Sequence, residues 1–81
     1  MRIFISNLNS FTTVSQLKTL FIPFGLVLSI KLMIHGETGY SQSAAYIEME
    51  KGAGIKAIQK LNNMRFMNHF ILVEETSAST I

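Results

Sequence analysis

The sequence contains no cysteine, no tryptophan and a single proline, and only 15% of its residues are charged. The lack of cysteine excludes disulfide bridges, thiolate metal sites and cysteine nucleophiles, and makes the cytoplasm the expected location. The longest apolar stretch, residues 26–34, is interrupted by Ser29 and Lys31 and is too short to cross a membrane. Because a predicted strand begins almost at Met1, no signal peptide is expected either.

The sequence also lacks any arrangement of residues that is typical of catalysis or metal binding. The histidines, His35 and His69, have no metal-ligand spacing between them, so a packed or solvated role is expected for each. No Ser/His/Asp set, paired carboxylate site or glycine-rich phosphate loop can be assembled from the sequence. The sequence therefore predicts no enzyme, no metal site and no cofactor.

What remains is a short, apolar and slightly basic chain. Its 81 residues are 48% hydrophobic, which is enough for one folded domain with a modest core. A net charge of +2 permits a nucleic-acid partner without requiring one. We expect a single domain over residues 1–75 and a short polar tail over residues 76–81.

The first helix is predicted from a cap and an apolar stripe. Thr13 and Gln16 have the spacing of a capping box, in which each side chain bonds the backbone of the other residue. The apolar residues that follow at helical spacing are Val14, Leu17, Leu20, Phe21 and Phe24. Pro23 and Gly25 are expected to end this helix.

Strands and a second helix complete the pattern. Strands are predicted where apolar residues alternate or cluster, over residues 3–8, 27–34, 43–49 and 69–75. The second helix is predicted over residues 51–61, with a frayed first turn because Gly52 and Gly54 lie near its start. The connector over residues 64–68 is expected to place Phe66 beneath the sheet.

This βαββαβ order predicts an α+β fold, a ferredoxin-like sandwich. Its antiparallel strands should pair in the spatial order fourth, first, third, second, with both helices on one face of the sheet. The predicted core comprises the residues that point toward the helices: Ile3, Ile5, Leu17, Phe21, Ile30, Ala45, Ile47, Ile58, Leu61, Ile71 and Val73. The other face of the sheet should then be open.

Two aromatic residues, Phe4 and Tyr46, are predicted on this open face. Rings on an exposed strand face suit stacking on a base or on a partner side chain, whereas burial on both faces is the structural alternative. Four further residues make the same face unusually apolar: Met33, Ala44, Phe70 and Leu72. An apolar patch of this kind is more typical of a protein contact than of a nucleotide groove.

Residues 3–8, Ile-Phe-Ile-Ser-Asn-Leu, resemble the RNP2 hexamer of the RNA recognition motif. Residues 38–49 resemble the loop and strand that contain the RNP1 motif of that family, and the helix positions are similar too. The chain looks most like small single-domain bacterial RNA-binding proteins. The resemblance implies a partner, single-stranded RNA, and RNA-contacting residues on or beside the open face: Phe4, Tyr46, Ser6, Arg2, Lys31, Gln42, Tyr40 and Leu72.

The RNP1 segment departs from the family pattern. The basic residue, glycine and aromatic residue that the family expects are replaced by Gln42, Ser43 and Ala44. Glu48 and Glu74 also point toward the open face and reduce its positive field, so weak RNA binding is predicted. The alternative is a protein-interaction variant, in which the apolar face binds a protein partner or forms a weak homodimer.

Overall fold

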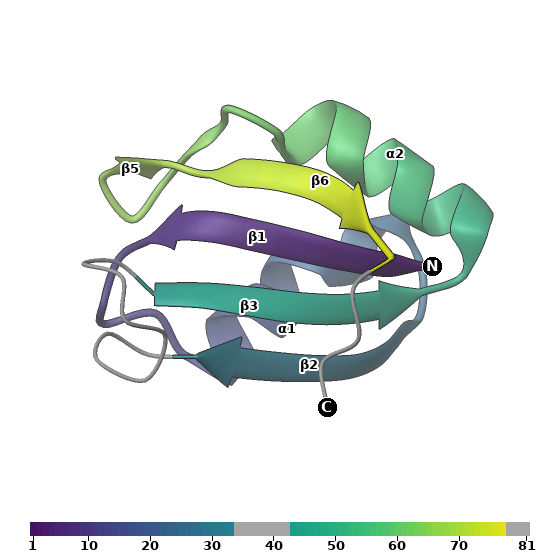
Figure 1. Ribbon diagram of the computed structural model, residues 1–81, viewed down its shortest axis with the longest axis horizontal. Coiled ribbons are helices and arrows are strands. Elements are labelled where there is room, and N and C mark those ends of the chain that lie inside the picture. Colours follow the sequence, from purple (N-terminus) through teal and green to yellow (C-terminus); the bar gives the residue numbers. More distant parts are fainter. Residues whose placement is uncertain (34–42, 78–81) are drawn as a thin grey trace.

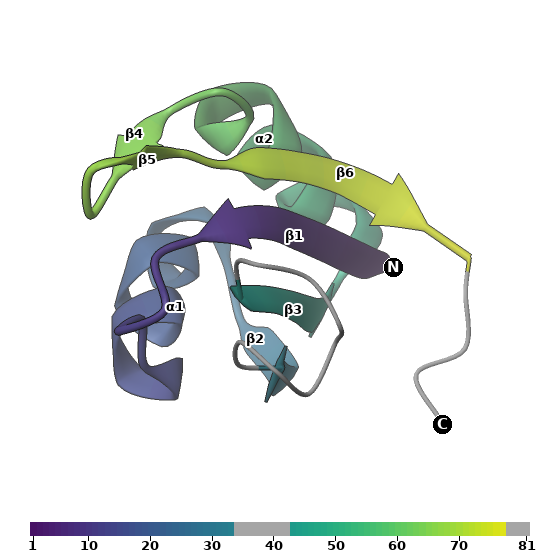
Figure 2. The ribbon, with the colours of Figure 1, turned by 60° about the vertical axis from the view of Figure 1, so that its left-hand side comes forward.

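A computed structural model of the chain describes residues 1–33 and 43–77 (Figure 1). Its elements are, in order, β1 (Arg2–Leu8), α1 (Val14–Phe21), the 3₁₀ turn η1 (Ile22–Phe24), β2 (Val27–Met33), β3 (Ser43–Met49), α2 (Lys51–Leu61), β4 (Arg65–Phe66), β5 (His69–Phe70) and β6 (Leu72–Thr76). The main sheet is antiparallel and has the order β2-β3-β1-β6. This order confirms the predicted ferredoxin-like sandwich, with both helices on one face of the sheet (Figures 1 and 2).

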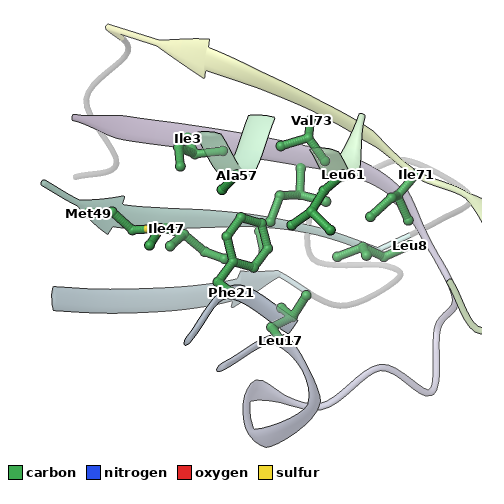
Figure 3. Packing of buried hydrophobic residues seen from close by; sticks show 12 residues of the cluster. Ile3, Leu8, Leu17, Phe21, Ile47, Met49, Ala57, Leu61, Ile71 and Val73 are labelled. Atoms are coloured by element: carbon green, nitrogen blue, oxygen red, sulfur yellow. The ribbon is translucent and has the colours of Figure 1, made fainter. Parts of the chain in front are cut away.

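The core fills the space between the sheet and the helices (Figure 3). Most of the predicted core residues are completely or almost completely buried, and Leu8, Met49 and Ala57 join them. Ile30 and Ile58 are only partly buried and pack against the core from its margin. The prediction for these two was wrong in degree: β2 is an edge strand and leaves Ile30 without a neighbouring strand on one side, and Ile58 lies on α2 at the margin of the core.

The first helix begins as the sequence indicates. The Thr13 side-chain oxygen accepts a hydrogen bond from the Gln16 backbone at 3.2 Å, and the Gln16 side chain accepts one from the Thr13 backbone at 2.8 Å. The helix ends at Phe21, before Pro23, and Gly25 follows with a φ of +150°. A Cβ on Gly25 would lie 2.6 Å from the Ala53 Cβ, so the close approach of α2 also requires glycine there.

Two details of the helices differ from prediction. Val14 is 46% exposed, because it lies in the first turn, before α1 reaches the core. The first turn of α2 is a regular capped turn, since the Glu50 carboxylate accepts a hydrogen bond from the Ala53 backbone at 3.0 Å. Gly54 in this turn is buried, and a side chain there would clash with Met1.

The predicted last strand is divided in the structure. Residues 69–70 form β5, which pairs with β4, and β6 continues one residue further than predicted, to Thr76. The turn between β4 and β5 has positive φ angles at Met67 and Asn68, which bend the chain sharply. Phe66, in β4, packs against the core as predicted.

Candidate nucleic-acid interface

The register of the sheet places the open-face side chains in three rows that run from β2 to β6. The first row is Ser29, Glu48, Arg2 and Thr76. The second row is Lys31, Tyr46, Phe4 and Glu74. The third row is Met33, Ala44, Ser6 and Leu72, with a bulge in β1 where it faces Ala44. Six of the residues predicted to contact RNA are therefore brought together on one surface.

The centre of this surface is a pair of rings. Phe4 and Tyr46 are directly opposed on the two central strands, and their ring centroids are 5.1 Å apart with the planes tilted by 47°. A tilted pair at this separation is a favoured aromatic arrangement, so each ring helps to hold the other in place. Both side chains are partly exposed, in contrast to the completely buried Ile3 and Ile5 beside Phe4 on β1.

Charged side chains lie around the rings, and their positive and negative charges are equal in number. An Arg2 guanidinium nitrogen lies 3.0 Å from a Glu48 carboxylate oxygen, in a partly exposed ion pair within the first row. Lys31 and Glu74 occupy the two ends of the second row, on opposite edges of the sheet. The rows thus contain two basic and two acidic residues, and the formal charge of the surface is zero.

Apolar side chains extend the surface away from the ion pair. Leu72 in the third row is 45% exposed, and Phe70, beyond that row, is 62% exposed. The Asn7 amide donates a hydrogen bond to the Phe70 carbonyl at 2.9 Å, and the His69 ring lies 3.1 Å from the Asn7 carbonyl. These contacts fix the β4–β5 hairpin beside the end of β1, as Figure 2 shows.

One predicted member of the apolar surface is not exposed. Ala44 is on the expected face but is only 2% exposed. Its methyl group is short and lies close to the sheet backbone, opposite Met33 in the third row. Ala44 therefore forms part of the floor of the surface, and the prediction that it adds exposed apolar area was wrong.

Two site predictions cannot be placed, and one neighbour was missed. Tyr40 and Gln42 lie outside the described residues. Thr76, assigned to the tail from the sequence, pairs with Arg2 and completes the first row. The alternation of Leu72, Glu74 and Thr76 was a usable signal, because residues two apart on a strand share a face.

Groups of acidic, histidine or cysteine side chains that could hold a metal ion are absent from residues 1–33 and 43–77. Within the same described ranges, no helix is both long and apolar enough to cross a membrane. Within the described residues, the three rows of the open face therefore remain as the candidate functional site.

The sequence model of the RNA recognition motif matches residues 3–72. The chain belongs to the RNA recognition motif family. In this motif, aromatic residues of RNP1 and RNP2 on the four-stranded sheet stack on two or three bases. Tyr46 and Phe4 stand on the strands that contain the segments similar to RNP1 and RNP2, as the resemblance implied.

Solved RNA recognition motifs have the same fold. The crystal structure of RNA-binding protein PG1 is 27% identical, with a TM-score of 0.86 over 100% of this chain and 99% of that one. The motif of Rna15 with bound RNA (GU) is 25% identical, with a TM-score of 0.81 over 99% and 86%. The motif of S. pombe Puf1 is 28% identical, with a TM-score of 0.75 over 98% and 100%.

Proposed function

We propose that this RNA recognition motif binds single-stranded RNA on its open sheet face, with Phe4 and Tyr46 as stacking platforms. The observation that supports this most directly is the pair of partly exposed rings, 5.1 Å apart on the two central strands. Every base has an apolar face, so two rings can accept bases with little dependence on sequence. The function is therefore binding rather than catalysis.

The remaining row residues would act around the stacked bases. The Ser6 hydroxyl can donate or accept a hydrogen bond at a base edge, and Leu72 offers apolar contact to a base or a sugar. Arg2 and Lys31 can contact phosphates, although Arg2 is shared with Glu48. Tyr40 and Gln42 stay predicted contacts from the loop that precedes β3.

The affinity we expect is micromolar rather than nanomolar. Stacking on an aromatic side chain contributes about 1–3 kcal/mol per base, and the two rings supply two such terms. Phosphate attraction supplies most non-specific affinity for nucleic acids, and the zero formal charge of the three rows limits that contribution. We also propose that the domain expected over residues 1–75, with Thr76 added as the last residue of β6, is the RNA-binding unit, and that it acts in the cytoplasm.

A second candidate function is a protein contact through the same face. The exposure of Leu72 and Phe70 next to the ring pair favours it, because exposed apolar area is stabilised by any partner that covers it. The two functions use overlapping residues, so RNA and a protein partner would exclude each other.

The RNA proposal is tested by fluorescence anisotropy with a labelled pool of short single-stranded RNAs. Phe4→Ala and Tyr46→Ala should each weaken binding by about 5- to 150-fold, the equivalent of one lost stacking platform. Phe11→Ala is the matched control, because Phe11 is 81% exposed in a loop outside the three rows. It should bind like the wild type.

The double variant Phe4→Ala/Tyr46→Ala decides the mechanism. Its circular dichroism spectrum should match that of the wild type, since neither ring belongs to the core. If the folded double variant bound the RNA pool as tightly as the wild type, the two rings would not be the stacking platforms.

A further inference from the structure

The three rows of the open face have a symmetry that the fold itself does not require. In the second row, the basic residue Lys31 and the acidic residue Glu74 lie at the two ends, with the two rings between them. In the third row the ends are apolar, Met33 and Leu72. The ends of the second row thus carry opposite charges, and the ends of the third row are both apolar. A surface with such complementary ends can pair with a copy of itself.

The position of the symmetry axis follows from the order β2-β3-β1-β6. A two-fold axis parallel to the strands, between β3 and β1, places β2 of one copy over β6 of the other. Lys31 then faces Glu74 of the second copy, and Glu74 faces its Lys31. The same rotation places Tyr46 over the second copy's Phe4 and Met33 over its Leu72.

The first row agrees with this arrangement. Arg2 and Glu48 are neighbours on the central strands, 3.0 Å apart at their charged atoms. The rotation places each of them over the opposite charge in the second copy, so four alternating charges meet in a ring. All four charged residues of the face thus face a charge of opposite sign.

The other in-plane two-fold axis, perpendicular to the strands, gives the opposite result. Centred on the second row, it places Lys31 over Lys31 and Glu74 over Glu74 of the second copy. Like charges in direct opposition destabilise a contact, so the second copy does not bind in this orientation. Charge complementarity therefore selects one axis, the one along the strands.

We propose that this protein self-associates sheet to sheet about that axis, with Lys31 and Glu74 of the two copies paired across the contact. Stacked sheets rotate by about 30° relative to each other, and this rotation displaces Phe4 and Tyr46 least, because they lie nearest the centre of the contact. Because the contact covers Phe4 and Tyr46, single-stranded RNA should dissociate the dimer. The inference does not depend on RNA binding, because the dimer forms without RNA.

The size of the contact indicates a weak dimer. Strands about 4.8 Å apart and same-face residues about 6.8 Å apart give the rows roughly 400 Å² of sheet on each copy. The resulting total of about 800 Å² is below the 1,200–2,000 Å² or so of stable complexes. We therefore expect a dissociation constant on the order of hundreds of micromolar.

Sedimentation equilibrium of the RNA-free chain, up to about 1 mM, tests the proposal through charge reversal. Lys31→Glu and Glu74→Lys should each weaken association by about tenfold, because each replaces two attractions with two repulsions. The double variant Lys31→Glu/Glu74→Lys should associate like the wild type, since it restores both pairs with the signs exchanged.

Two control variants separate this effect from net charge. Lys56→Glu changes the net charge as Lys31→Glu does but lies on the exposed side of α2, and Glu75→Lys matches Glu74→Lys on the other face of β6. Both controls should associate like the wild type. A wild-type protein that stays monomeric throughout the range would overturn the proposal, and so would a double variant as weak as the single ones.

Discussion

Ile5 and Phe4 are neighbours on β1, yet Ile5 is completely buried under the helices while part of Phe4 remains exposed on the other face. The same contrast separates Ile47 from Tyr46 on β3. One face of the sheet stabilises the fold, and its opposite face retains apolar and aromatic groups that the fold does not need. Because successive side chains of a strand point to opposite faces, a residue that stabilises the core is followed by one that is available for binding.

The two sides of the molecule differ in charge as well. On the helix side, the lysines of α2 are exposed: Lys51, Lys56 and Lys60. On the open face, two basic and two acidic residues cancel. The excess positive charge therefore lies away from the rings, and on the proposed function we expect stacking rather than phosphate attraction to supply most of the affinity for RNA.

The largest difference between the faces should appear in stability. Ile5→Ala removes completely buried groups and should lower the free energy of unfolding by about 2–5 kcal/mol. Phe4→Ala should lower it by about 1 kcal/mol, because its ring is partly exposed and packs against one other ring, that of Tyr46. Urea unfolding of both variants measures the contrast. Equal losses would mean that the open face is part of the core.

A smaller difference is expected in the salt dependence of RNA binding. With about two phosphate contacts, the logarithm of the binding constant should fall with the logarithm of salt concentration at a slope near −1.4. Lys31→Gln should bring the slope to about −0.7, since it removes one contact. Lys56→Gln, on α2, should leave it unchanged. If the α2 variant changed the slope instead, the phosphates would lie on the helix side.

Most of the fold could be predicted because the signals are local. Alternation within each strand determines which side chains face the helices, and the Thr13–Gln16 cap determines where α1 begins. The division of the last strand at Ile71 could not be predicted, since it depends on hydrogen bonds between the Ile71 backbone and the backbone of Asn63 and Met64. The turn at Met67 and Asn68, where the φ angles are positive, likewise depends on contacts within the fold, such as the hydrogen bond from the Asn9 amide to the Met67 carbonyl.

The face on which the candidate site residues lie was predictable, and their detailed surroundings were less so. The face of each candidate follows from the two-residue period, which placed Phe4, Tyr46 and Leu72 correctly. The burial of Ala44 depends on its packing in the folded sheet, and the Arg2–Glu48 ion pair depends on register between β1 and β3. Register and cross-strand neighbours are properties of the folded sheet, so single-strand patterns do not reveal them.

The claim that the open face is the RNA surface is tested most directly by an NMR titration with pooled short single-stranded RNA. The account predicts that resonances of Phe4, Tyr46 and Leu72 shift in proportion to bound RNA, while those of Lys56 and Lys60 on α2 do not. Shifts confined to α2, with the Phe4 and Tyr46 rings unaffected at saturation, would contradict it.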